Sequence, residues 1–230
     1  SRAGLYLPLM FQRPTPVIWN LLIINGLVFV ATALLSGKDL PIDRLIVLHK
    51  SNLLGLHDVV MQKGTPYFSL PGMGMLRADL FRPYQIVTHF FAHGGFFHFL
   101  FNMLALFSIG TPVEMVLGSK RFLEFYLFCG VLGGIFIAFL DPSPAPVLGA
   151  SGAVSGVAVA FALFFPNNKL FIFPFPFPVK AWKLVLGFGI LSLVLVISSP
   201  SGGGISHFGH LAGMVCAVLF FFVGKLIGKH

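Results

Sequence analysis

Six long apolar runs constrain this chain more than any other feature of its sequence. They cover residues 17–35, 96–113, 122–140, 147–165, 181–198 and 207–226. Each run is close to the length of about 20 residues that a helix needs to cross the hydrocarbon core of a bilayer. Only 10% of the 230 residues are charged, whereas soluble domains contain about 25%. The sequence therefore predicts an all-α polytopic membrane protein with six transmembrane helices, and it excludes a soluble globular domain.

The basic residues between the runs predict the orientation of these helices. Nine of the 15 Lys and Arg residues fall at the chain ends or in short connections on one side: Arg2, Arg13, Lys120, Arg121, Lys169, Lys180, Lys183, Lys225 and Lys229. Cytoplasmic loops of membrane proteins carry such an excess, so both termini are expected in the cytoplasm. A nucleic-acid-binding protein would gather its bases on one solvated face. The expected partner is the lipid bilayer, and nucleic acid is not expected.

The connection between the first two runs, residues 36–95, is too long to lack structure in a compact protein. Its segment 67–81 mixes Phe, Leu and Met with Gly, Pro and single charges, which is typical of a segment at a membrane interface. We therefore expect a long membrane-associated first loop. Residues 171–178, FIFPFPFP, are expected to form a cytoplasmic-side loop because their prolines repeatedly remove backbone donors.

Polar residues are placed at the starts of three of the predicted helices. With the N-terminus inside, the second, fourth and sixth helices run in the same direction, and their first turns share one depth. These turns carry His98 and Asn102, Ser151 and Ser155, and His207 and His210. At a rise of about 1.5 Å per residue, groups three to five residues into a helix lie roughly 5–8 Å below the outer surface. The sequence therefore predicts a shared, water-reachable cavity just under that surface.

These polar groups have both a structural and a catalytic interpretation. Ser151 and Ser155 follow the small-xxx-small spacing of tightly packed membrane helices, and an intramembrane His or Asn often only joins two helices. In the catalytic interpretation, the Ser151 hydroxyl needs an adjacent base, and the imidazole of His210 is suited to that role. His98, Asn102 and the backbone N–H of Ser151 would then stabilise the oxyanion.

The predicted catalytic unit is a dyad rather than a triad. The apolar runs carry no acidic residue at this depth, so nothing there would orient the imidazole as a triad carboxylate does. Asp141, in the connection after the third run, is expected to be solvated.

Together these motifs resemble those of the rhomboid family of intramembrane serine proteases, of the bacterial type. The resemblance covers most of the chain from Phe81 onward. The residues 149–152, GASG, resemble the GxSG nucleophile motif, and the residues 209–213, GHLAG, resemble the histidine motif of the sixth helix. The HFLFN segment from His98 to Asn102 resembles the HxxxN motif of the oxyanion hole. Ser155 stands where many members carry a tyrosine, so it is the less expected nucleophile.

Two further positions match the family less closely. Arg82 resembles the arginine of the first-loop Trp-Arg element, with Phe81 in place of the tryptophan. Glu114 resembles the structural glutamate that ends the second helix.

The resemblance implies one rhomboid-like membrane domain over residues 1–230, with a six-helix core and no metal or cofactor. It implies hydrolysis of transmembrane segments of membrane-protein substrates near the outer membrane face, with Ser151 as nucleophile and His210 as base. Substrates would enter through a lateral gate between the second and fifth helices. The assigned support residues, structural or gating, are Gly149, Gly152, Glu114 and Arg82. The expected location is a bacterial plasma (inner) membrane.

Three other functions remain open at this point. A metal-dependent membrane enzyme would use the imidazoles of His89, His93, His98, His207 and His210, which suit a transition metal, but no carboxylate or HExxH motif accompanies them. A non-catalytic rhomboid-like binding protein usually lacks the serine or the histidine, and this chain keeps both. A transporter would be built from two related halves with paired broken helices, and these are not evident.

Overall fold

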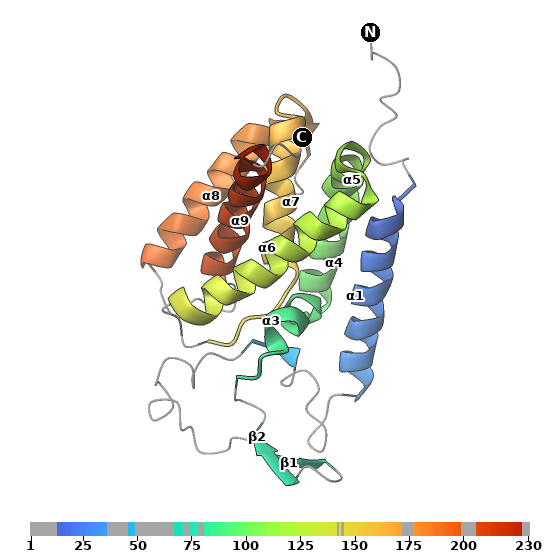
Figure 1. Ribbon diagram of the computed structural model, residues 1–230, viewed down its shortest axis with the longest axis vertical. Coiled ribbons are helices and arrows are strands. Elements are labelled where there is room, and N and C mark those ends of the chain that lie inside the picture. The colour runs from blue at the N-terminus through green and yellow to red at the C-terminus, as the bar shows by residue number, and fades with distance from the viewer. Residues whose placement is uncertain are drawn as a thin grey trace.

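A computed structural model describes residues 13–35, 46–48, 67–70, 74–77, 81–141, 143, 145–171, 177–198 and 206–226. The described part is a helical bundle (Figure 1), and it contains five helices that are long and apolar enough to cross a membrane. These are α1 (Pro16–Leu35), the continuous segment Phe96–Leu117, α6 (Ser119–Leu140), α8 (Ala181–Ser198) and α9 (His207–Leu226). A sixth apolar helix, α7 (Ser151–Phe164), is shorter. The predicted all-α membrane fold is therefore confirmed.

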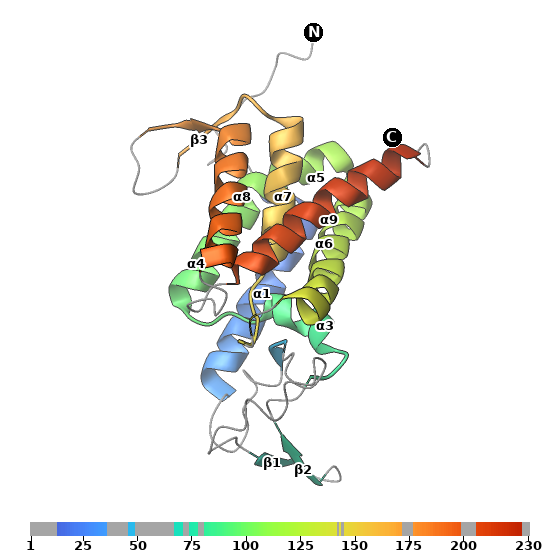
Figure 2. The same ribbon diagram turned by 90° about the vertical axis from the view of Figure 1, so that its left-hand side faces the viewer.

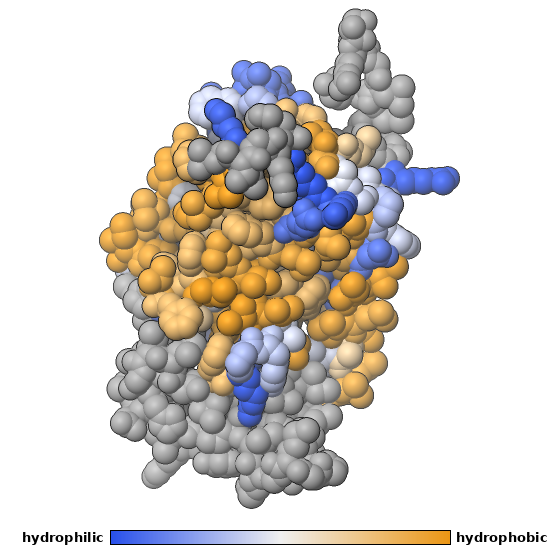
Figure 3. All heavy atoms as spheres, viewed as in Figure 1, coloured by the Kyte–Doolittle hydropathy of each residue, from blue (hydrophilic) through white to orange (hydrophobic). Residues whose placement is uncertain are grey.

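The helices alternate in direction through the bundle. The segment Phe96–Leu117, α7 and α9 all begin at one end, while α1 begins and α9 ends at the opposite end (Figures 1 and 2). On the face that Figure 3 shows, apolar side chains cover the middle, and most of the hydrophilic side chains collect toward the end where α1 begins. This separation is the one that a bilayer requires.

The second membrane-crossing segment contains an irregular turn. Helix α4 (Phe96–Ala105) continues into a π-helical turn, Leu106–Gly110, and then into α5 (Thr111–Leu117). Pro112 is the second residue of α5, two positions after this turn ends. Because proline has no N–H to donate to the carbonyl four residues back, the helix at this point cannot keep its regular hydrogen bonding, and a π turn is one way to accommodate the break. The predicted helix 96–113 is thus present and extends by one further turn.

Glu114 connects α1 to the end of this segment. Its carboxylate accepts hydrogen bonds from the backbone N–H groups of Val17 (3.1 Å) and Ile18 (2.9 Å) in the first turn of α1. It also accepts hydrogen bonds from the hydroxyls of Thr15 (2.5 Å) and Ser119 (2.6 Å). A carboxylate in this position satisfies free N–H groups and interacts favourably with the positive end of the α1 dipole. Glu114 therefore fastens α1 to α5 and α6.

The fourth helix begins four residues later than the sequence predicts. Residues 147–150 are not helical, and α7 starts at Ser151. Val147 instead forms an antiparallel bridge with Leu48 of the first loop, with N···O distances of 2.9 and 3.0 Å. Gly149 adopts a φ of 115°, which a helix cannot contain. The prediction of a helix over 147–165 is wrong for this physical reason, and Ser151 is the first residue of the helix rather than one turn inside it.

Several pieces of the long first loop are described. The strands β1 (Tyr67–Leu70) and β2 (Gly74–Arg77) form an antiparallel hairpin, and a short helix α3 (Gln85–Thr88) leads into a 3₁₀ turn, His89–Phe91. A second small hairpin joins β3 (Lys169–Leu170) to β4 (Val179–Lys180) before α8. The predicted membrane association of the rest of the first loop, and most of the loop predicted at 171–178, lie outside the described residues.

Candidate active site

Helices α7 and α9 meet along a seam of glycines. A Cβ placed on Gly213 would overlap the carbonyl of Gly152. A Cβ on Gly152 would come within 3.2 Å of the Gly209 carbonyl, and one on Gly156 within 3.0 Å of the Gly213 carbonyl. Glycines four residues apart on both helices thus let the two backbones approach closely. The small-xxx-small spacing at the start of α7 therefore serves close helix packing, as its structural interpretation predicts.

This close approach brings Ser151 and His210 together. Ser151 is the first residue of α7, and His210 lies in the first turn of α9. A distance of 3.0 Å separates His210 Nε2 from Ser151 Oγ, which is a hydrogen bond in the tautomer that leaves Nε2 free to accept. The imidazole is buried, with 7% of the residue exposed. The arrangement is that of a hydroxyl nucleophile beside a base.

Ser155 lies one turn further along α7 and is engaged elsewhere. Its hydroxyl donates a hydrogen bond of 2.6 Å to the carbonyl of Ser151. This back-bond to the carbonyl four residues earlier is common for serine within helices. Of the two serines, Ser151 is the one whose hydroxyl contacts an imidazole.

His98 approaches the same point from α4. A Cβ on Gly149 would lie 2.7 Å from both Cε1 and Nε2 of His98 and 3.7 Å from Ser151 Oγ. The absence of a side chain at Gly149 therefore makes room for the His98 ring beside the serine hydroxyl. Asn102 is buried, and its side-chain amide donates a hydrogen bond of 2.8 Å to the backbone carbonyl of His98. Asn102 thus fixes the first turn of α4, on which His98 stands.

Within the described residues, the second ring nitrogen of His210, Nδ1, is buried and has no hydrogen-bonding partner. Asp141 is buried as well, with 4% exposed, and it accepts a hydrogen bond of 3.1 Å from the backbone N–H of Ser143. The expectation that Asp141 is solvated is therefore wrong, because this carboxylate closes the loop that follows α6.

The first loop supports the serine from the end of the bundle where α7 begins. The backbone N–H of Gly149 donates to the carbonyl of His89 at 2.9 Å, and the hydroxyl of Thr88 donates to the carbonyl of Ile46 at 2.9 Å. Together with the bridge between Leu48 and Val147, these bonds fix the extended segment that leads into Ser151. Such support is needed because a serine at the very start of a helix has no preceding turn to hold it.

Two first-loop histidines lie next to this segment: His89 is buried and His93 is half-buried. Burial lowers the pKa of His89 to about 4, and its Nδ1 lies 2.9 Å from the carbonyl of Gln85. Burial and the neighbouring His98 lower the pKa of His93 to about 4. The His93 and His98 rings are 5.3 Å apart in an edge-to-face arrangement. Both first-loop imidazoles are therefore neutral near pH 7.

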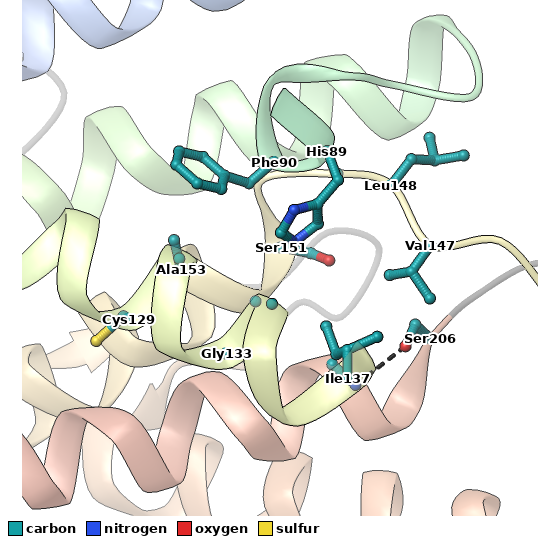
Figure 4. Close-up of a pocket in the computed structure, with 15 residues that line it drawn as sticks. His89, Phe90, Cys129, Gly133, Ile137, Val147, Leu148, Ser151, Ala153 and Ser206 are labelled. Atoms are coloured by element: carbon teal, nitrogen blue, oxygen red, sulfur yellow. Dashed lines mark hydrogen bonds between the residues drawn. The ribbon is translucent and has the colours of Figure 1, made fainter. Parts of the chain in front are cut away.

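A cavity lies behind the serine. It is lined by His89, Val147, Ser151, Ile137 and glycines of α6 and α7, and it has an empty volume of about 320 Å³ including the part open to solvent. Figure 4 shows His89 and Ser151 reaching into this space from different segments, with Ile137 of α6 across from them. The cavity thus places the His89 ring and the Ser151 hydroxyl beside one small space between the first loop, α6 and α7.

Two residues near the site were not predicted from the sequence. The ring of Phe188 on α8 lies 5.1 Å from the ring of His210 at an angle of 38°, and nothing in an apolar run marks one phenylalanine among many. Ser206 is the second: its hydroxyl accepts a hydrogen bond of 3.0 Å from the backbone N–H of Gly209. A serine directly before a helix is a recognisable N-cap, so this contact was predictable.

The remaining predicted residues lie around the dyad or away from it. Arg82 is in the first loop, where its backbone N–H donates to the side-chain oxygen of Gln85 at 3.0 Å. Glu114 lies near the opposite end of its helix, at the start of α1. Within the described residues, no group of three or more His, Cys, Asp or Glu side chains converges to hold a metal ion.

The chain is similar to a family model and to several known proteins. Residues 80–225 match the family model described as "Rhomboid domain". The chain is 32% identical over 160 residues to Rhomboid protein 1, mitochondrial, of Saccharomyces cerevisiae, covering 63% of the chain and 43% of the relative. It is 33% identical over 135 residues to rhomboid protease GluP of Bacillus subtilis, covering 57% of the chain and 24% of the relative.

Not every relative is named as a protease. Inactive rhomboid-related protein 2 of Caenorhabditis elegans is 28% identical over 145 residues, covering 61% of the chain and 40% of the relative. The chain spans between 24% and 43% of the length of these three curated relatives.

Proposed function

The chain belongs to the rhomboid family, an assignment that rests on the match over residues 80–225, and we propose that it is an intramembrane serine endopeptidase that acts through a dyad of Ser151 and His210. The observation that carries the proposal is the 3.0 Å distance between His210 Nε2 and Ser151 Oγ. These atoms belong to residues far apart in the sequence and on different helices. Their approach depends on the glycine seam, because the seam brings the first turns of α7 and α9 close together.

The first step of the proposed reaction is acylation of the serine. As Ser151 Oγ attacks the carbonyl carbon of the scissile peptide bond, its proton passes to His210 Nε2. The carbonyl oxygen becomes an oxyanion. When the C–N bond breaks, the same proton passes from His210 to the leaving amine. Water then attacks the ester carbonyl of the acyl-enzyme and gives a proton to His210. As the ester C–O bond breaks, His210 returns that proton to Ser151 Oγ and the carboxylic acid product leaves.

The oxyanion would be stabilised by donors from two helices. The first N–H groups of a helix have no partner within the helix, and Ser151 stands at the start of α7, where the dipole also favours negative charge. The His98 ring lies beside Gly149 and can supply a further N–H. We assign Asn102 to the same function. Its hydrogen bond to the His98 carbonyl also stabilises the turn of α4 that carries His98.

We further propose that the substrates are transmembrane segments of other membrane proteins, cut near the outer face. They would enter between the segment Phe96–Leu117 and α8. The protein itself is an integral membrane protein of the rhomboid family. We propose a bacterial plasma membrane with both termini in the cytoplasm, and a single domain over the whole chain. The collection of basic residues where α1 begins supports this orientation.

The proposal is tested by labelling with a fluorescent fluorophosphonate, a probe that reacts with activated serines. The protein is purified in detergent as wild type, Ser151→Ala, His210→Ala and the matched control Ser155→Ala. Label is expected in wild type and Ser155→Ala and is expected to be lost in the other two. Loss in Ser155→Ala alone would move the nucleophile by one turn. An unlabelled, folded wild type that also leaves a model transmembrane substrate uncut would favour a binding role.

The oxyanion assignment has its own test. Asn102→Ala is expected to lower kcat by about 10- to 1,000-fold with little change in KM, as for loss of an oxyanion donor. Asn25→Ala is the matched control, since Asn25 also donates to the carbonyl four residues back, at 2.8 Å, in the distant helix α1. An unchanged kcat in Asn102→Ala would reduce Asn102 to a packing residue.

A further inference from the structure

Helix α8 borders the site, although little of it is buried. Of its residues, Ala181 and Ser192 are buried, and only 11% of its membrane-crossing window is buried, the smallest share of the five candidate spans. It packs on α7 and α9, and its other faces expose residues such as Leu191 (55%) and Ile197 (72%). A helix with so few buried contacts is displaced at a lower cost than α7 or α9.

One side chain of α8 nevertheless contacts the proposed base. The Phe188 ring lies on the His210 ring with centroids 5.1 Å apart and planes at 38°. On its own helix, His210 has the edge of His207 at 5.9 Å. Its Nε2 contacts Ser151, and its Nδ1 has no hydrogen-bond partner within the described residues. Among the described residues no hydrogen bond at Nδ1 holds the plane of this imidazole, and the aromatic contact with Phe188 restricts its rotation.

We infer that Phe188 is a positioning residue for His210 and that α8, through this ring, sets whether the base is aligned with Ser151. This inference rests on the proposed function. The ring limits rotation of the imidazole about its side-chain bonds. Its negative face also attracts the imidazolium that forms when His210 takes the serine proton. A substrate helix that pushes α8 outward would withdraw the ring, and full activity would return only when α8 closes again.

The experiment separates base alignment from substrate entry. Wild type, Phe188→Leu, Phe188→Tyr and the control Leu191→Ala are compared by two measurements: the rate constant of labelling by a fluorophosphonate, and kcat and KM for a model transmembrane substrate. The probe is small and reports on the dyad without entry of a helix. Phe188→Leu is expected to lower both the labelling rate and kcat by about 5- to 50-fold, part of what a positioned base contributes, with KM nearly unchanged. Phe188→Tyr and Leu191→Ala are expected to stay within about two-fold of wild type.

Each other outcome has a definite meaning. If wild type is not labelled, the proposed function fails. If wild type is labelled and Phe188→Leu is labelled at the same rate, the inference fails alone. A change in substrate cleavage without a change in labelling would make Phe188 a gate residue only and would overturn the inference. Equal losses in folded Phe188→Leu and Phe188→Tyr would overturn it too, because the ring would then not matter. If Phe188→Leu does not fold, Phe188→Met is measured in its place.

Discussion

Helices α9 and α8 both contain glycines and both border the site, but they are held in opposite ways. On α9, a Cβ at Gly213 would overlap the backbone of α7. On α8, a Cβ at Gly187 would meet no atom within 4 Å, and one at Gly189 would meet the flexible end of Met214 at 3.1 Å. Glycine in a membrane helix therefore does not by itself indicate tight packing. What matters is whether another backbone passes close to it.

This difference matches two requirements of the proposed function. Ser151 and His210 would have to keep a hydrogen-bonding distance, and the glycine seam between α7 and α9 provides a rigid base for both. Under the same proposal a substrate helix would have to reach them from the lipid, which requires an element that can move. The sparsely buried α8 is suited to that movement, whereas α9 holds the distance between His210 and Ser151.

Gly213→Ala is expected to have the largest effect, because it removes the close packing of α9 on α7. Because the new methyl group would overlap a backbone carbonyl that has no freedom to rotate away, we expect the two helices to separate. The free energy of unfolding should fall by about 3 kcal/mol or more, at the upper end of overpacking costs, and cleavage should fall below detection. Thermal unfolding in detergent and a cleavage assay measure the two effects. Gly26→Ala in α1 is the control, since a Cβ there meets nothing within 4 Å.

An acid titration tests the buried first-loop residue His89, whose carbonyl supports the segment before Ser151, without altering the glycine seam. The pKa of His89 is about 4 in the folded protein, lowered by burial from about 6.5. Above pH 6.5 the folded and unfolded states are both neutral at this residue, so stability is fully retained. As the pH falls from 6.5 to 4, the unfolded state binds a proton that the folded state does not. The free energy of unfolding should therefore fall, by about 3 kcal/mol at pH 4.

The His89 contribution is identified by comparison with His89→Gln, which has no proton to bind in this range. The wild type should lose stability more steeply than His89→Gln between pH 6.5 and 4 in denaturant titrations. Parallel pH dependence in the two proteins would show that His89 is not the group responsible.

Much of this architecture could be predicted from the sequence, because membrane helices are read from hydrophobicity and length. The boundaries of α8 and α9 are those predicted. The late start of α7 was not predicted, since it depends on a strand-like pairing of Val147 with Leu48 from a distant loop. Long-range pairing leaves no periodic signal. The GxSG and histidine motifs pointed to Ser151 and His210, but the same motifs contain the seam glycines, so spacing alone could not separate packing from chemistry.

The contacts of α8 were the least predictable part of the site. Phe188 is one of 28 phenylalanines, and only the crossing of α8 over α9 brings it to His210. In this helix, side chains that face outward and the side chain that faces the proposed base are equally hydrophobic. Three-dimensional placement was needed to distinguish them.

A glycine substitution in the loosely packed helix α8 is expected to have a much smaller effect. Gly187→Ala in α8 adds a methyl group where no atom lies within 4 Å, so there is no clash to offset the higher helix propensity of alanine. The free energy of unfolding is expected to rise by up to about 1 kcal/mol, with cleavage within about two-fold of wild type. The same unfolding and cleavage assays measure both. A large loss of cleavage in the folded variant would mean that a substrate helix passes closely over Gly187, and α8 would then be packed during the reaction as tightly as α9 is packed at rest.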